Sequence, residues 1–241
     1  MAVFTRREVV AGTVMLLVGG RWAAAEVISG RIPFRPSSAS RHAAIGEGWK
    51  FLSATEVATL EAVADRIIPP DAETPGGKGA GCVVFIDRQL AGGYGQAAGW
   101  YEQGPFVKGL AQQGSQSEQN PAQQYRTALA GIDGLARKRS GRAFPTLSAD
   151  EQDTLLKGLE DGSLAIEGID SKTFFQNLVT DMQQGFFADP IYGGNRDMCS
   201  WKMIGYPGAR YDYRDWIGRH NEVYPYPPVS IAGRAEWTPR R

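Results

Sequence analysis

Hydrophobic residues recur every three or four positions in several stretches of the chain, and each stretch is bounded by residues that begin or end helices. The clearest begins at Ser53, which a glutamate follows three residues later in the capping-box pattern, and it ends before the prolines at 69–70. A second capping box begins at Ser148, and Gly162 ends the apolar pattern that follows. Both stretches are predicted to be helices.

The same signals predict three further helices. They span residues 82–90, 121–139 and 171–184. Asn120, followed by proline, is a favourable start for the second of them. A weaker pattern predicts a helix at 97–113, and the glycine-rich stretch 76–79 is interpreted as a turn. Because no segment alternates as a strand does, we expect a mostly α fold, a single domain of about five to six helices within residues 49–216.

Composition adds limits to this picture. The 241-residue chain has 26 Lys plus Arg and 26 Asp plus Glu, so its formal charge is zero. Without a basic stripe, neither nucleic acid nor an anionic membrane surface is an expected partner. Thirty glycines and fourteen prolines predict many turns and long connections. The length suits one sizeable core.

The first 25 residues have the composition of a bacterial export signal. Arg6 and Arg7 precede an uncharged, mostly apolar run at 9–20, and the alanines at 23–25 supply a small-residue cleavage site. As a helix this run would span about 18 Å, short of the ~30 Å hydrocarbon core, so a signal is favoured over a membrane anchor. The adjacent arginines indicate the twin-arginine route, which exports folded proteins.

Two alternatives stay open for this segment. Val9 and Ala11 stand where twin-arginine signals usually have an aromatic residue and a lysine, so a general secretion signal is the second interpretation. An amphipathic first helix of the mature fold is the third. Residues 26–48 are rich in Ser, Arg and Pro, without apolar period, and are predicted to form an extended arm.

Residues 185–216, called the signature segment below, read GFFADPIYGGNRDMCSWKMIGYPGARYDYRDW. They combine eight aromatic residues with five glycines and show no helical or alternating period. We interpret the segment as a structured loop. Because such a loop has no backbone ladder of its own, its rings must be buried against the body of the protein or against another chain.

Residues 217–241 are predicted to form an extended tail, because the Tyr-Pro-Tyr-Pro-Pro run at 224–228 disfavours both helix and central strand. Aromatic residues on a proline-rich tail suit a segment that lies across a partner's surface. A tail folded back on its own domain is the alternative.

Two runs of the signature segment, Phe187–Asp197 (FADPIYGGNRD) and Trp201–Ala209 (WKMIGYPGA), carry a family resemblance. They are similar to the signature of the gluconate 2-dehydrogenase subunit 3 family, and a looser similarity covers residues 52–87. The resemblance implies a small, non-catalytic subunit of a membrane-bound, FAD-dependent dehydrogenase of gluconate or a related sugar acid or polyol.

In that family the large subunit binds FAD and takes the hydride, and a multihaem cytochrome c passes electrons to the quinone pool. The resemblance therefore implies FAD and haem c on the partner subunits and no cofactor on this chain. It also implies a periplasmic complex, peripherally associated with the inner membrane. The twin-arginine translocase, which would recognise Arg6 and Arg7, is expected to export this chain together with the folded large subunit.

The candidate contacts to the large subunit are the aromatic residues of the signature segment and the tail, with one arginine. They are Phe187, Tyr192, Arg196, Trp201, Tyr206, Tyr211, Trp216, Tyr224, Tyr226 and Trp237. The alternative function is a stand-alone periplasmic enzyme or binding protein, in which Asp197 and His220 would act as acid and base. In a loop, such residues more often cap turns and form structural ion pairs, and we favour that interpretation.

Only two cysteines and two histidines are present, too few for an iron–sulfur cluster or a His-rich metal site, and no haem-attachment motif occurs. In an oxidising compartment Cys82 and Cys199 would form one intramolecular disulfide, or both would remain free thiols, or Cys199 would bridge to a partner. The residue types alone leave these three alternatives open. The chain also lacks a dinucleotide-binding glycine fingerprint.

Overall fold

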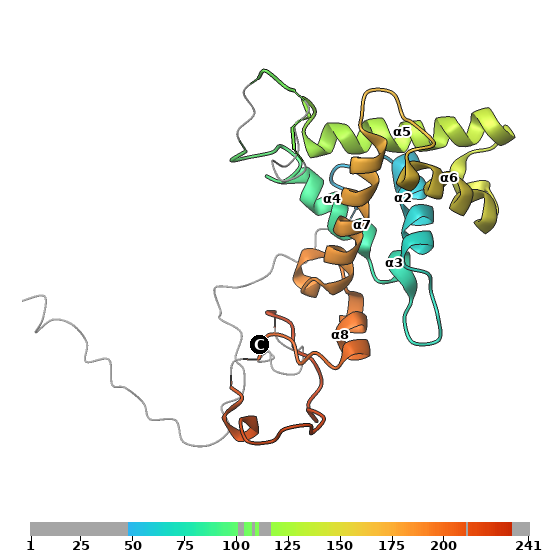
Figure 1. The fold of residues 1–241 in the computed structure, drawn as a ribbon. Coiled ribbons are helices and arrows are strands. Elements are labelled where there is room, and N and C mark those ends of the chain that lie inside the picture. Colours follow the sequence, from blue (N-terminus) through green and yellow to red (C-terminus); the bar gives the residue numbers. More distant parts are fainter. Residues whose placement is uncertain (1–47, 101–103, 108, 111–116, 211, 233–241) are drawn as a thin grey trace, which may run out of the picture. The chain divides into compact units, whose positions relative to one another are not determined.

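The computed structural model describes residues 48–100, 104–107, 109–110, 117–210 and 212–232 (Figure 1). Within these residues the fold consists of α-helices joined by turns and short 3-10 helices, and no strand forms. The α-helices are α2 (Ala54–Ile67), α3 (Gly76–Gly79), α4 (Cys82–Ala91), α5 (Pro121–Ser140), α6 (Ala149–Asp161), α7 (Ser171–Phe187) and α8 (Cys199–Ile204). The prediction of a mostly α fold is confirmed.

The helix ends follow the predicted signals. The side chains of Ser53, Asn120 and Ser148 each accept a hydrogen bond from the backbone N–H three residues later, and the Glu or Gln at that position bonds back to the cap. Gly141 and Gly162 end α5 and α6 in the left-handed region, with φ of 71° and 82°. These caps satisfy backbone groups that the helices leave unpaired at their ends.

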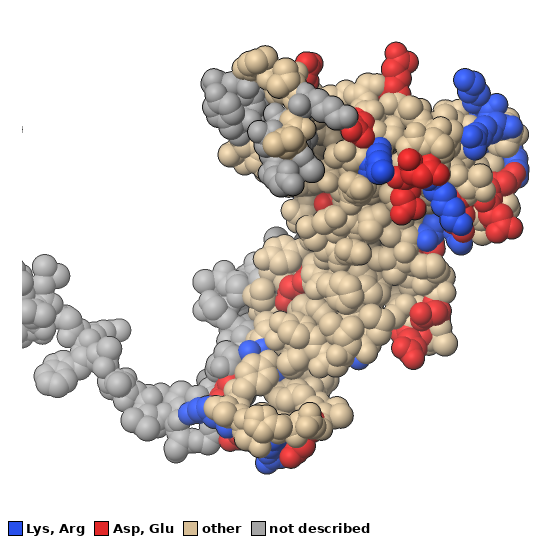
Figure 2. All heavy atoms as spheres, viewed as in Figure 1, with Lys and Arg blue, Asp and Glu red and all other residues tan. Residues whose placement is uncertain are grey.

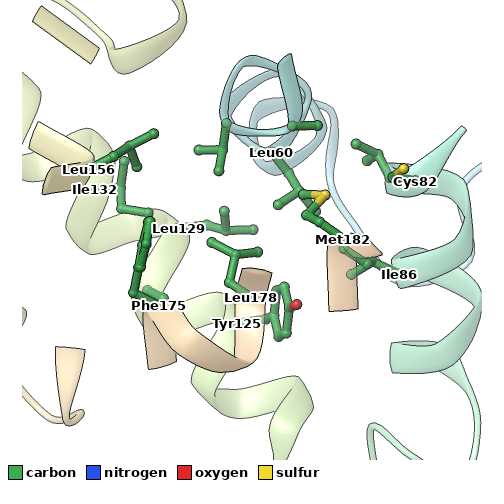
Figure 3. Close-up of a cluster of buried hydrophobic side chains, with 14 of the residues drawn as sticks. Leu60, Cys82, Ile86, Tyr125, Leu129, Ile132, Leu156, Phe175, Leu178 and Met182 are labelled. Atoms are coloured by element: carbon green, nitrogen blue, oxygen red, sulfur yellow. The ribbon is translucent and has the colours of Figure 1, made fainter. Parts of the chain in front are cut away.

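Helix α7 lies at the centre of the core, where it packs against α4 and α6. Leu178 and Met182 of α7 are buried in one cluster with Leu60 of α2, Ile86 of α4 and Leu129 of α5 (Figure 3). Because side chains from at least four helices meet in this cluster, a large-to-small substitution there is expected to cost about 2–5 kcal/mol.

The stretch 76–79 forms the one-turn helix α3, so its interpretation as a turn is corrected. The N–H of Gly77 donates to the carbonyl of Ile68 at 2.8 Å. A Cβ atom at Gly77 would lie 2.6 Å from the carbonyl oxygen of Ala64 in α2. Close packing against α2, which only glycine permits, therefore shapes this stretch.

The helix predicted at 97–113 is wrong for the described residues of that range, which form turns and irregular backbone. Gly99 has a left-handed φ of 87°, and Pro105 follows a cis peptide bond. The left-handed backbone at Gly99 does not continue a helix. The helix predicted at 171–184 forms as α7 and extends to Phe187, three residues beyond the predicted end.

The chain leading into α2 is held by Asp87, a buried residue of α4. Its carboxylate accepts the backbone N–H groups of Lys50, Phe51 and Leu52 at 2.8, 2.9 and 2.9 Å. The Nη1 atom of Arg88 lies 3.0 Å from the same carboxylate. Three successive backbone donors and one cation thus compensate the burial of this charge.

The predicted export signal at 1–25, with Arg6 and Arg7, and all but the last residue of the predicted arm at 26–48 lie outside the described residues. In the part of the chain that the structure does describe, no helix is both long enough and apolar enough to cross a membrane.

Candidate partner-binding surface

Glycines attach the signature segment to the helical body. Gly193 and Gly194 lie against Gly81, which precedes α4, and against Gly185 of α7. A Cβ atom at Gly81 would lie 2.7 Å from the carbonyl oxygen of Gly193, and one at Gly194 would overlap the carbonyl oxygen of Gly185. The backbones therefore meet at a distance that no larger residue allows.

The signature segment forms three 3-10 turns and the short helix α8, joined by irregular backbone, so the predicted structured loop contains short helical turns. Asn195, fully buried with a left-handed φ of 45°, organises this part. Its Oδ1 accepts from the backbone N–H and the hydroxyl of Ser200 at 3.0 and 2.8 Å, and its Nδ2 donates to the carbonyl of Ala188 at 2.9 Å. The residue is structural.

Trp201 of α8 is buried, and its Nε1 donates to the carbonyl of Phe187 at 2.9 Å. The ring of Tyr206 packs edge-on against it, with centroids 5.2 Å apart. The rings of Phe187 and Tyr206 themselves remain exposed. The aromatic residues of the signature segment are thus divided between its own core and its surface.

The described part of the tail folds back onto the signature segment. Val229 and Ser230 are buried, and Val229 forms a parallel bridge with Gly208. The carboxylate of Asp189 accepts the hydroxyl of Ser230 at 2.6 Å and the backbone N–H of Ile231 at 2.8 Å. For residues 217–232 the structure therefore follows the folded-back alternative instead of the extended tail.

Four aromatic rings of the signature segment and the tail pack against one another in a partly exposed group, called the tail cluster. They belong to Tyr213, Trp216, Tyr224 and Tyr226, and their contacting centroids are 5.2–6.4 Å apart. The guanidinium group of Arg210 lies over Tyr224 and Tyr226, at 5.5 and 5.4 Å from the ring centroids. Aromatic and cation–π contacts of this kind hold the Tyr-Pro-Tyr run in place.

The residues predicted to contact the large subunit differ in their exposure. Those on the surface are Phe187, Tyr192, Arg196 and Tyr206. Trp201 is buried, and Trp216, Tyr224 and Tyr226 are half-buried in the tail cluster. Tyr211 and Trp237 lie outside the described residues.

The prediction missed the aliphatic members of this surface. They are Met203, Ile204, Ile217, Val223 and Ile231, all exposed. Their sequence signal was weak, because apolar residues without a helical or alternating period do not reveal which side they present. Together with Phe187, Tyr192 and Tyr206 they make up what is called the signature surface below.

The acid–base arrangement considered for Asp197 and His220 does not form in the structure. Both side chains are exposed, and within the described ranges no hydrogen bond or ion pair joins them. Asp197 has a left-handed φ of 55°, as in a turn. A search of the same ranges finds no group of three His, Cys, Asp or Glu residues placed to hold a metal ion.

A buried carboxylate that the sequence analysis did not single out lies on α7. Asp181 accepts the hydroxyl of Tyr125 at 2.6 Å and that of Tyr94 at 3.1 Å. Burial raises the pKa of the Asp181 carboxyl, and burial and the neighbouring carboxylate raise the pKa of both tyrosines. The sequence signal that could have identified this buried carboxylate is an acidic residue at an apolar position of the helical pattern.

Cys82 and Cys199 are free thiols in the structure. Cys82 is fully buried at the start of α4, and burial raises its pKa to about 12 (Figure 3). Cys199, at the start of α8, is partly exposed, and its pKa is raised by burial as well. A high thiol pKa makes a cysteine a poor nucleophile, so neither residue has the character of a catalytic thiol.

Comparison with known families places this geometry in context. The family model described as gluconate 2-dehydrogenase subunit 3 matches residues 54–208. The matched range begins at the start of α2 and ends in the signature segment at Gly208, which forms the bridge with Val229. Searches of curated proteins and of solved structures returned no match. On the match over residues 54–208, the chain belongs to the gluconate 2-dehydrogenase subunit 3 family.

Proposed function

We propose that this chain is the small, non-catalytic subunit of a membrane-bound dehydrogenase complex that oxidises gluconate or a related sugar acid or polyol. Family membership supports its place in a gluconate 2-dehydrogenase complex. The observation that carries the binding role is the signature surface: of the fourteen large hydrophobic residues exposed in the described ranges, nine lie between Phe187 and Ile231, namely its eight members and Tyr213 of the tail cluster. Exposed apolar residues concentrated in one part of a chain are expected at a protein–protein interface.

The partner in this proposal is the large FAD-binding subunit, whose flavin would accept the hydride. The contribution of this chain is a preformed surface. Trp201 and Asn195 fix the backbone from beneath, through hydrogen bonds to the carbonyls of Phe187 and Ala188. Because little ordering remains to be done on binding, more of the apolar burial, about 25 cal/mol per Å², is available as affinity.

Export follows from the same proposal. A flavoprotein folds around its cofactor before it leaves the cytoplasm, so it needs the twin-arginine route. Arg6 and Arg7 on this chain would address both subunits to that translocase, and the complex would then face the periplasm with a multihaem cytochrome c at the inner membrane. Replacing both arginines by lysine should leave the complex assembled but retained in the cytoplasm. Export of the large subunit in cells that lack this chain would contradict the escort role.

The central test is co-purification from native membranes with a tag after Arg241, followed by mass spectrometry and a flavin absorption spectrum. We expect a flavoprotein and a c-type cytochrome in fixed ratio. Recovery of this chain alone and colourless would contradict the proposal.

Two phenylalanines provide a matched pair for the surface. Phe187 on the signature surface is 44% exposed, and Phe106, in the connection before α5, is 38% exposed. Phe187→Ala should lower the recovery of the flavoprotein at least tenfold, about 1.4 kcal/mol of binding free energy. Phe106→Ala should leave it unchanged. Equal recovery with both variants would show that the signature surface is not the interface.

A further inference from the structure

The outer face of α7 carries no charge over most of its length. From Thr173 to Phe187 the one charged residue is Asp181, which is buried and bonded to two tyrosine hydroxyls. The exposed residues are Thr173, Gln176, Asn177, Thr180, Gln183, Gln184 and Phe187. Their spacing of three or four places them on one side of the helix, here called the α7 stripe.

The neighbouring helices differ. The outer face of α5 carries Arg126, Arg137, Lys138 and Arg139, and that of α6 carries Asp150, Lys157, Glu160 and Asp161. Figure 2 shows charged side chains gathered over α5 and α6, whereas the surface over α7 is largely uncharged. The uncharged outer face of α7 therefore contrasts with those of α5 and α6 and is not a property of the whole surface.

Two small pockets border the α7 stripe, with Tyr94 lining both. Gln184 lines the first, beside Phe85 and Gln89, and Asn177 lines the second, beside Trp100. Hydrogen bonds from the Tyr94 hydroxyl to Asp181 hold this shared wall in position. Small pockets beside a neutral surface are suited to receive apolar or aromatic side chains of another protein.

We propose that the α7 stripe continues the signature surface and that the flavoprotein subunit lies along both. This inference rests on the proposed function for the identity of the partner. Phe187 joins the two surfaces, since it is the last residue of α7 and the first of the signature surface. Depletion of charged residues is the compositional mark of the buried centre of an interface. The facing segment of the partner is uncharged, offers groups that pair with amides and hydroxyls, and places apolar side chains in the pockets beside Tyr94.

Two threonines allow a controlled test. Thr180 of α7 and Thr154 of α6 are both exposed mid-helix residues, and each hydroxyl donates to the carbonyl four residues earlier, at 2.9 and 2.7 Å. In the co-purification from native membranes, Thr180→Lys should lower the recovered flavin absorbance at least tenfold. Thr154→Lys should leave it at the wild-type level. Thermal unfolding of each purified chain checks that the variants are folded.

A second variant, Gln183→Glu, places the opposite charge on the stripe, and the inference requires it to lose the flavoprotein too. Retention of the flavoprotein by either Thr180→Lys or Gln183→Glu overturns the inference while the proposed function stands. If the wild-type chain itself recovers no flavoprotein, the proposed function fails and this inference fails with it.

Discussion

The hydroxyl of Ser230 donates a 2.6 Å hydrogen bond to the carboxylate of Asp189, a residue 41 positions earlier in the chain. The same carboxylate accepts the N–H groups of Ile231 and Ile191. Because these contacts close the chain between residues 189 and 231, the signature segment and the tail are one structural unit.

Replacing Asp189 by alanine should open this unit. The change leaves buried donors without partners, at a cost of roughly 1–3 kcal/mol. We expect faster cleavage within residues 210–228 in limited proteolysis, followed by mass spectrometry. Asp212→Ala is the control, because within the described residues this carboxylate pairs with Arg214 nearby, and exposed ion pairs of this kind contribute little to stability. Identical cleavage of the two variants would show that Asp189 does not hold the tail.

Glycine packing beneath the signature segment gives a second prediction. Alanine at Gly194 would place a methyl group on the carbonyl oxygen of Gly185, so the segment must shift and stability should fall by about 1–3 kcal/mol. Gly134, on the exposed side of α5, has no atom within 4 Å of such a methyl group. Gly134→Ala should instead stabilise the protein by up to ~1 kcal/mol. Urea unfolding of both variants measures the difference, and a neutral Gly194→Ala would contradict the packing.

The buried Asp181 predicts a pH dependence of stability. Burial raises its folded-state pKa above the usual value of 3.8, so the protonated carboxyl favours the folded state. The stabilisation is fully present below that usual value and is lost as the pH rises through the folded pKa. Asp181→Asn cannot ionise and lacks this loss. The free energy of unfolding of wild type relative to Asp181→Asn should therefore fall as the pH rises above about 4, and a flat difference would contradict the assignment.

Thiol labelling separates the three alternatives for the cysteines. If both are free, iodoacetamide at pH 8 should modify the partly exposed Cys199 first, and Cys82 only after unfolding, because it is buried and its pKa is about 12. An intramolecular disulfide would leave both unmodified in unfolded protein until a reductant is added. A bridge from Cys199 to a partner would instead release a second chain on reduction. Peptide mass spectrometry distinguishes these outcomes.

Local sequence signals were sufficient for the long helices. Capping residues such as Ser53, Asn120 and Ser148 act on backbone groups within one turn, so their effect can be predicted without knowledge of the fold. The stretch at 76–79 could not be predicted in this way, because its helical turn depends on contact between Gly77 and Ala64.

The candidate surface was predicted only in part, for a similar reason. The signature segment stood out by its aromatic content. Which of its rings are buried could not be predicted, because Trp201 is buried with a hydrogen bond to Phe187, and Tyr206 is exposed, only in the folded chain. The return of the tail depends on Asp189 reaching Ser230, and no local pattern reports such a pairing. The α7 stripe could not be predicted either, because the sequence does not show that Asp181 is buried while its neutral neighbours are exposed.

The hold of Asp87 on Lys50, Phe51 and Leu52 has a mechanical consequence. Tension applied to the chain ahead of α2 reaches three hydrogen bonds to one carboxylate before it reaches the first turn of the helix. These bonds anchor three successive residues to one buried side chain of α4. We therefore expect the helical body to stay folded when the segment that precedes residue 48 is pulled or cut.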